Sequence, residues 1–152
     1  MRLIPVKQFV EDNTELAAFP DCREMVQMST DYYTRVGFNP PWISYYAEEN
    51  GQLVGCGGFK GKPVNGQVEI AYYTFPDYEQ KGVGSQMCHE LVELALHADP
   101  SVNVTARTMP ENNYSSRILQ KNSFQLMGTI MDEEDGVVWE WRYFEKPEVE
   151  SL

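Results

Sequence analysis

The first strong pattern is an apolar residue at every third or fourth position over residues 22–36, which is the period of an amphipathic helix. The apolar positions are Met25, Met28, Tyr32 and Val36. Asp21 stands at the N-cap position, Glu24 completes a capping box, and Gly37 is a typical stop signal. A second helix is predicted over residues 83–98, where the apolar stripe consists of Val83, Met87, Leu91, Leu94 and Ala95.

Runs of β-branched and aromatic residues between turn residues predict the strands. Residues 42–59 contain two such runs around Asn50-Gly51, which is the strongest short signal for a hairpin. Further strands are predicted near residues 3–6, 67–75, 102–109, 124–131 and 137–144, and a short helix over residues 112–122. Hairpins and strand–helix–strand crossovers together predict a mixed α/β (α+β) fold, with a mixed, mostly antiparallel sheet flanked by helices.

Length and cysteine usage narrow the class of protein. The chain has 152 residues, of which 42% are hydrophobic, and this predicts one domain over residues 1–146 with a tail over 147–152. The three cysteines (Cys22, Cys56 and Cys88) predict thiols in a reducing compartment, and no CxxC pair indicates a metal site. Because no apolar run resembles a signal peptide or a membrane span, a soluble cytoplasmic protein is expected.

The charge balance disfavours several classes of partner. Twelve basic residues face 23 acidic ones, which gives a net charge of −11. Such a field repels nucleic acid and anionic membranes and attracts cations such as amines, although it also serves solubility alone.

The segment "FPDYEQKGVGSQM", residues 75–87, nevertheless looks suited to an anion. Gly82 and Gly84 let a ligand approach the backbone, and the helix that follows offers amides without internal partners at the positive end of its dipole. Lys81 adds one local positive charge. The segment is neither a Walker loop nor a dinucleotide fingerprint, because GxxxxGK[ST] is absent and Met87 occupies the place of the third glycine. Taken alone, it is also compatible with an ordinary strand–helix turn.

Two motifs together resemble the GNAT N-acetyltransferase superfamily, including its small bacterial members and its ribosomal-protein N-terminal acetyltransferases. The run "EQKGVGS" is similar to the acetyl-CoA loop Q/R-x-x-G-x-G/A, with Glu79 at its first position. "NNYSSRILQKNSF", residues 112–124, is similar to N-x-x-S-x-x-V-L-E-K-x-G-F, with Ser123 in place of the usual glycine. The resemblance covers about residues 45–144, including the closing hairpin, and implies the GNAT fold.

The resemblance implies acetyl-CoA as cosubstrate. Its pantetheine and acetyl carbonyl would lie along a splayed strand, and its pyrophosphate on the amides of residues 80–85. The implied cofactor-binding residues are Tyr73, Thr74, Phe75, Gln80, Lys81, Gly82, Val83, Gly84, Ser85 and Asn112. Asn112 is also a candidate N-cap of the short helix, and both roles are compatible. We expect the carboxylate of Glu79 to face away from the pyrophosphate, or Glu79 to contact the rest of the cofactor only through its backbone.

The implied reaction is direct attack of a primary amine on the thioester in a ternary complex. It requires a neutral amine, donors for the oxyanion and a proton for the leaving thiolate. Glu69 is the candidate base, because a carboxylate in its otherwise apolar strand is costly unless it is exposed or used. The alternatives are a solvated or ion-paired Glu69 and a water chain. Leu119 occupies the position of the family's usual tyrosine. Members that resemble ribosomal-protein N-terminal acetyltransferases have a serine earlier in the motif, so the resemblance implies Ser115 near the sulfur, with Tyr114 or water as alternatives.

The acceptor remains open at this point. An aromatic group of Trp42, Tyr45, Tyr46, Tyr72 and Tyr73 offers one or two residues to an acceptor pocket, the others being core. The acceptor is a small molecule or a protein amine, and the acidic net charge favours a cationic one. The chain is a monomer or a homodimer, since strand 137–144 either closes the sheet or pairs with a second copy. The competing hypotheses are a non-catalytic acyl-CoA-binding or regulatory module of the same fold and a structural or protein-interaction role.

Overall fold

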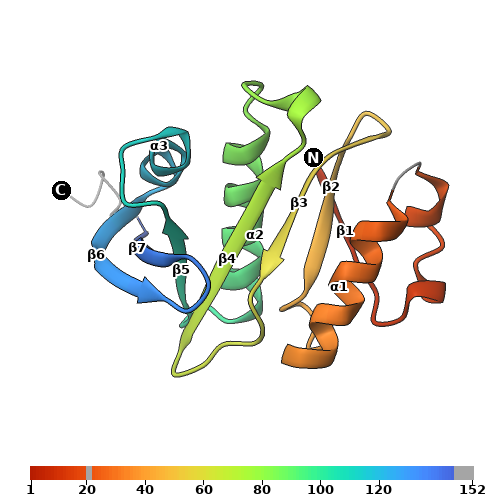
Figure 1. Cartoon of the computed structure of the whole chain (residues 1–152), viewed down its shortest axis with the longest axis horizontal. Helices are drawn as coiled ribbons and strands as arrows, with labels where there is room; N and C mark the ends of the chain where they lie inside the picture. The colour runs from red at the N-terminus through yellow and green to blue at the C-terminus, as the bar shows by residue number, and fades with distance from the viewer. Residues whose placement is uncertain (20–21, 146–152) are drawn as a thin grey trace.

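One twisted sheet with helices on both faces forms the molecule (Figure 1). The computed structural model describes residues 1–19 and 22–145. The sheet has seven strands in the order β1-β2-β3-β4-β5-β7-β6. The strands are β1 (Arg2–Pro5), β2 (Ser44–Glu49), β3 (Gln52–Phe59), β4 (Gln67–Thr74), β5 (Asn103–Thr108), β6 (Phe124–Asp132) and β7 (Gly136–Tyr143). Strands β4 and β5 pair in parallel and the other neighbours pair antiparallel, which confirms the predicted mixed, mostly antiparallel sheet.

The helices also follow the predicted pattern. They are α1 (Arg23–Val36), α2 (Val83–Ala98) and α3 (Tyr114–Lys121). Cys22 occupies the N-cap of α1, and the predicted cap at Asp21 lies outside the described residues. Gly37 ends α1 at φ 92°, a conformation that favours glycine. Three short 3₁₀ helices, η1 (Val10–Asp12), η2 (Leu16–Ala18) and η3 (Pro76–Tyr78), were not predicted. Within the described residues, no helix has the length and apolar character that crossing a membrane requires.

The Asn50-Gly51 pair forms the hairpin turn as predicted. Both residues are left-handed, with φ of 52° and 79°, which matches the type I′ turn that suits the twist of two adjacent strands. The pairing of Glu49 with Gln52 closes the hairpin directly around the turn.

Strand β7 resolves one open alternative. It lies between β5 and β6 and is paired on both sides, so it closes the sheet within the chain. Pairing of this strand with a second copy is therefore wrong, because β7 has no unpaired edge to offer. The tail over residues 147–152 lies outside the described residues.

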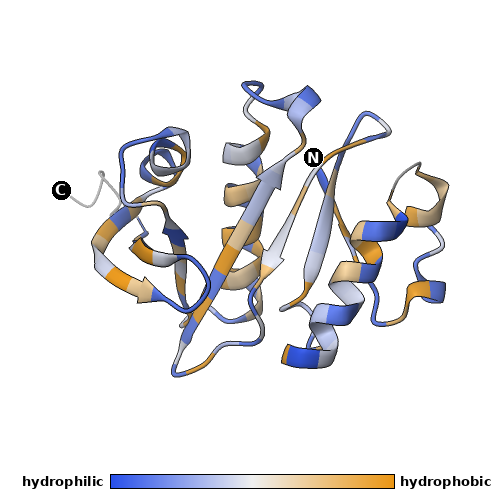
Figure 2. Ribbon diagram, in the orientation of Figure 1, coloured by the Kyte–Doolittle hydropathy of each residue, from blue (hydrophilic) through white to orange (hydrophobic). Residues whose placement is uncertain are grey.

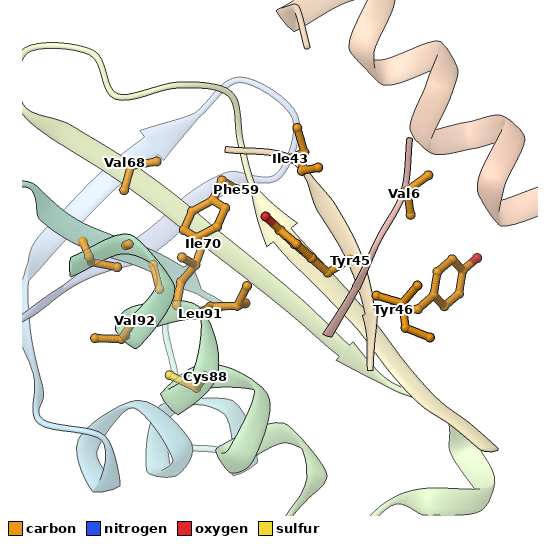
Figure 3. Close-up of a cluster of buried hydrophobic side chains, with 14 of the residues drawn as sticks. Val6, Ile43, Tyr45, Tyr46, Phe59, Val68, Ile70, Cys88, Leu91 and Val92 are labelled. Atoms are coloured by element: carbon orange, nitrogen blue, oxygen red, sulfur yellow. The ribbon is translucent and has the colours of Figure 1, made fainter. Parts of the chain in front are cut away.

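Buried side chains cover both faces of the sheet, and their packing shows on which face each β4 side chain lies. Val68 and Ile70 are buried toward α2, whose Cys88, Leu91 and Val92 lie below the strands, while Val6 and Tyr46 lie on the side of α1 (Figure 3). Helix α2 is hydrophobic along most of its length, whereas hydrophobic and hydrophilic residues alternate along α1 (Figure 2). Since side chains alternate along a strand, Glu69, Ala71 and Tyr73 stand on the α1 face.

Candidate functional site

A split in the middle of the sheet is the central feature of the site. Strands β4 and β5 pair only from Gln67↔Asn103 to Glu69↔Thr105, and beyond this point they diverge (Figure 1). The carbonyl of Glu69 accepts from the Lys60 N–H at 2.9 Å, and the N–H of Phe75 donates to the Val54 carbonyl at 3.0 Å, so these groups point toward β3. The alternation of a strand then directs the N–H and C=O groups of Tyr72 and Thr74, and the C=O of Ile70, into the split, where they are available to a ligand. The backbone groups of Tyr73 and the N–H of Phe75, both at predicted cofactor-binding residues, point toward β3 instead.

On the α2 face, a cleft of about 460 Å³ lies between the end of β4 and α3; we call it the α3 cleft. Its lining residues are Tyr72, Tyr73, Thr74, Glu79, Gln80, Gly84, Tyr114, Ser115, Arg117 and Ile118. The structure thus brings together Tyr73, Thr74, Gln80, Gly84 and Ser115 from the residues that the sequence predicted. Glu79 also lines the cleft and is exposed, and the direction of its carboxylate relative to a pyrophosphate stays a prediction.

The glycine turn at the mouth of the α3 cleft has the shape of an anion-binding backbone. Gln80 and Gly82 are left-handed, with φ of 63° and 80°, and Gly82 is the N-cap of α2. The amide of Gln86 is the first to bond back, to the Gly82 carbonyl at 3.0 Å. The amides of residues 83–85 therefore have no partner within the helix, and they form the positive end of the helix dipole. Alternating backbone handedness before such an end makes a concave nest of N–H groups.

Most side chains around the glycine turn contact other parts of the protein, so the backbone is the main group that the turn offers to a ligand. A Cβ on Gly84 would lie 2.9 Å from Ile118 Cδ1 and 3.3 Å from Thr74 Oγ1, so any side chain there would make Ile118 move where α2 approaches α3 and β4. Val83 is buried and offers only its backbone. Ser85 Oγ accepts a hydrogen bond from Asn122 Nδ2 at 3.1 Å, and the ammonium of Lys81 lies 5.7 Å from the ring centroid of Tyr78.

The cap of α3 differs from the predicted one. Asn113 is the N-cap: its Oδ1 accepts from the Ser116 N–H at 3.0 Å, and its own N–H donates to Ser116 Oγ at 2.8 Å. Asn112 as N-cap is therefore wrong, because the reciprocal box forms one residue later. Asn112 is exposed and does not line the α3 cleft, so its contact with the cofactor stays a prediction.

Three residues with hydroxyl groups, Ser115, Tyr114 and Tyr72, line the α3 cleft and are candidates to protonate a leaving sulfur. Ser115 and Tyr114 are exposed and line the α3 cleft, whereas Leu119 is buried in the core. Tyr72 lines the cleft as well, but its hydroxyl is engaged with Cys88, and burial raises its pKa far above the usual range. Burial also raises the pKa of Cys88 to about 12. Tyr72 therefore keeps its proton, and Ser115 and Tyr114 are the better placed donors.

On the opposite face, a larger cavity of about 680 Å³ opens beside α1; we call it the α1 cavity. Its walls come from α1 (Tyr32, Arg35), β2–β3 (Ser44, Cys56, Gly57, Gly58, Phe59, Lys60), β4 (Glu69, Ala71, Tyr72, Tyr73) and the β5–β6 side (Arg107, Met131, Asp132, Glu133, Glu134). Tyr72 and Tyr73 line both the α1 cavity and the α3 cleft. The two hollows therefore meet at these residues, where β4 has already parted from β5. Trp42 lines neither of them and packs edge-on against Phe59, with ring centroids 5.2 Å apart.

Ion pairs hold Glu69 in the wall of the α1 cavity. Its Oε2 lies 2.9 Å from Lys60 Nζ, and its Oε1 lies 3.5 Å from Arg107 Nε. Arg107 also reaches Asp132 at 2.8 Å and Glu140 at 3.5 Å, which ties β4, β5, β6 and β7 together where the sheet splits. The Glu69 side chain is 17% exposed, so it is both ion-paired and accessible from the cavity.

Sequence reasoning missed Lys60 and Arg107. Arg107 carried the same signal as Glu69, a single charge in an otherwise apolar strand. The ion pair between Glu69 and Arg107 could not be predicted from the sequence, because the register of parallel strands joined by a long crossover is set by tertiary packing.

Asp132 gives this cluster a pH dependence that can be measured. Hydrogen bonds from Arg107 and from the amides of Glu134 and Asp135 lower the pKa of Asp132 to about 2. The stability it contributes is fully present above the unfolded-state pKa of about 4 and is lost as the pH falls toward about 2. Asp132→Asn should therefore lower the urea midpoint at pH 6, and its difference from wild type should shrink between pH 4 and pH 2. The matched control Glu134→Gln leaves all these bonds intact, and a pH-independent difference for Asp132→Asn would contradict the assignment.

Comparison with known proteins shows to which family the chain belongs. Residues 6–125 match the model of the acetyltransferase (GNAT) domain. The uncharacterized N-acetyltransferase YjdG of Bacillus subtilis (strain 168) is 29% identical over 106 residues, which cover 69% of this chain and 60% of that protein. The chain thus spans less than two thirds of the length of that relative.

Solved structures share the architecture. A spermidine N-acetyltransferase chimera of SpeG from Vibrio cholerae and hSSAT has a TM-score of 0.68 at 10% identity, covering 94% of this chain and 95% of that one. RimL, a ribosomal L7/L12 alpha-N-protein acetyltransferase in complex with coenzyme A, has a TM-score of 0.65 at 16% identity, covering 92% and 91%. At these identities the likeness shows the fold alone.

Proposed function

This chain belongs to the GNAT family of acetyltransferases, and we propose that it transfers the acetyl group of acetyl-CoA to a primary amine by direct attack in a ternary complex. One observation carries the proposal. The α3 cleft and the α1 cavity lie on opposite faces of the sheet and share Tyr72 and Tyr73 at the point where β4 and β5 have separated. Such an arrangement lets two ligands enter from opposite sides and meet end to end.

The chain's own groups fit acetyl-CoA in the α3 cleft. The nest of amides at residues 80–85 and the positive end of α2 suit a pyrophosphate without requiring basic side chains. The backbone groups of Tyr72 and Thr74, which point into the split, suit the amides of the pantetheine arm and the thioester carbonyl. When bound, the cosubstrate supplies an acetyl group on a thioester.

The groups in the α1 cavity fit the acceptor side. The acceptor arrives as an ammonium and loses two protons on its way to the amide. The carboxylate of Glu69 receives the first, directly or through a water, because it lines the cavity and is accessible from it. The neutral nitrogen then forms the new N–C bond, and its second proton leaves to solvent as the C–S bond breaks. On the other face, Ser115 Oγ or Tyr114 Oη donates a proton to the leaving sulfur.

The acceptor is proposed as an amine because the similar structures are named for amine acetylation. One is named for spermidine and the other for the alpha-amine of a ribosomal protein. Those two acceptors differ in size and charge, so neither is carried over to this chain.

A thiol-release assay with acetyl-CoA tests the proposal. Purified protein is mixed with acetyl-CoA and a panel of primary amines, and free thiol and the mass of the acetylated product are measured together. We expect amine-dependent thiol release with a matching product mass. Hydrolysis of acetyl-CoA without an acetylated amine would contradict amine transfer.

The second candidate is a non-catalytic acyl-CoA-binding module of the same fold. It is favoured by the buried Leu119 at the position of the usual tyrosine and by the two cations that already occupy Glu69. Acetyl-CoA binding by calorimetry with no transfer to any amine in the panel would select this candidate.

A further inference from the structure

A second, smaller hollow continues the α1 cavity away from the split. It has a volume of about 260 Å³, and we call it the inner chamber. Its lining residues are Val6, Met25, Met28, Ser29, Tyr32, Ser44, Tyr45, Tyr46, Cys56 and Gly57. Four of these, Tyr32, Ser44, Cys56 and Gly57, also line the α1 cavity, so the two hollows share a wall.

The shared wall lies next to the point where the α1 cavity meets the α3 cleft. In the β3–β4 ladder, Cys56 pairs with Tyr73 and Gly57 pairs with Tyr72. Neighbouring strands are about 4.8 Å apart, so the inner chamber begins one strand away from Tyr72–Tyr73. An acceptor whose nitrogen lies at Tyr72–Tyr73 thus has its carbon arm at the entrance of the chamber.

The two hollows differ sharply in charge. The α1 cavity is lined by three cations (Arg35, Lys60 and Arg107) and four carboxylates (Glu69, Asp132, Glu133 and Glu134). No Asp, Glu, Lys, Arg or His is among the residues that line the inner chamber. Burial raises the pKa of Cys56 to about 11, so its thiol is uncharged at neutral pH. The chamber offers thioethers, aromatic rings and an aliphatic side chain, and its small uncharged polar side chains are Ser29, Ser44 and Cys56.

We propose that the acceptor is a primary monoamine with an apolar arm, an alkyl chain or an aromatic ring, and that this arm occupies the inner chamber. The inference rests on the proposed function and specifies its substrate class. A cavity of about 150 Å³ lined by apolar side chains holds benzene, so a chamber of 260 Å³ has room for a ring or a short chain. Among the described residues that line the chamber, none is a carboxylate that could meet a second ammonium group, which disfavours polyamines of the same length.

The proposal makes a graded prediction for alkylamines. Each buried methylene is worth about fourfold in kcat/KM. Hexylamine should therefore exceed propylamine by roughly ten- to sixtyfold. The matched probe 1,6-diaminohexane has the same length but ends in a second charge, and it should fall at least about tenfold below hexylamine.

A variant that fills the chamber provides the structural control. Ser29 lies on α1 and lines the chamber, so Ser29→Phe places a ring inside it. We expect the hexylamine-to-propylamine ratio of kcat/KM to fall toward one in Ser29→Phe. Gln27→Phe makes the same substitution at an exposed position of α1 that lines neither hollow, and it should keep the wild-type ratio.

Calorimetry of the same amines without acetyl-CoA makes the test independent of turnover. Hexylamine should bind wild type at least about tenfold more tightly than propylamine or 1,6-diaminohexane, and Ser29→Phe should remove the difference. If amines are acetylated but the diamine equals or exceeds hexylamine, the apolar acceptor is refuted while the proposed transfer stands. If hexylamine binds selectively but no amine is acetylated, the chamber stands and the proposed transfer fails. Equal binding of all three amines refutes the chamber whatever the turnover.

Discussion

Ser85→Glu is expected to weaken acetyl-CoA binding by about thirty- to a hundredfold while leaving the fold intact. Ser85 is the third residue of α2, where the helix dipole favours a carboxylate by a few tenths of a kcal/mol. The same carboxylate would stand beside the amides that are proposed to hold the pyrophosphate. Two like charges roughly 6 Å apart at an effective dielectric constant of about 20 repel by about 2–3 kcal/mol.

The matched control is Ser85→Gln. It has the size of glutamate without the charge, and it loses the same hydrogen bond from Asn122. We expect its dissociation constant for acetyl-CoA, measured by calorimetry, to stay within about threefold of wild type. Because the repulsion is screened by ions, the gap between the two variants should narrow as salt is raised. Equal affinity of the two variants at low salt would remove the pyrophosphate from this turn.

Ser85 is a better position for this test than Gly84. A side chain at Gly84 meets Ile118 at 2.9 Å, so a large substitution there disturbs the packing of α2 on α3. Loss of binding in Gly84→Trp would not separate a blocked cleft from a displaced helix. The melting temperature without ligand makes the separation for Ser85→Glu, which should melt no lower than Ser85→Gln.

The fold could be predicted wherever the decisive information is local. The bounds of α2 follow from its apolar stripe and the glycines before it, and the β2–β3 hairpin follows from two residues with left-handed backbones. The N-cap of α3 was missed by one residue. Asn112 and Asn113 have the same side chain, and each is followed three residues later by a serine, Ser115 or Ser116, so the sequence offers two equivalent boxes and only the structure selects the second.

The site was predictable only in part, for a physical reason. The glycine turn is contiguous in sequence, so its resemblance to an anion-binding loop was visible. The ion pairs of Glu69 join residues that are nine and 38 positions apart, Lys60 and Arg107, through the register of three strands. Likewise, the meeting of the α1 cavity with the α3 cleft depends on where β4 and β5 stop pairing, and no residue type marks that point.

Glu69→Gln is expected to lower kcat/KM at pH 7 by at least about a hundredfold, the usual scale for loss of a general base. The control is Glu140→Gln. Glu69 and Glu140 both lie 3.5 Å from a nitrogen of Arg107, but Glu140 does not line the α1 cavity. Removing either carboxylate weakens the same cluster, so Glu140→Gln should stay within about threefold of wild type if the cavity carboxylate matters for proton transfer rather than for charge balance. Similar losses in both variants would reduce Glu69 to a structural ion pair.

The pH profile separates the two roles further. If Glu69 takes the proton from the bound ammonium, the wild-type enzyme uses acceptor that arrives charged, and its rate depends weakly on pH between 7 and 9. In Glu69→Gln only acceptor that arrives neutral reacts, and the neutral fraction of an amine with a pKa of about 10 rises about tenfold per pH unit. The deficit of Glu69→Gln should therefore shrink by up to about a hundredfold from pH 7 to pH 9. Parallel profiles for variant and wild type would show that Glu69 removes no proton, and a water chain from the α1 cavity would then be the base.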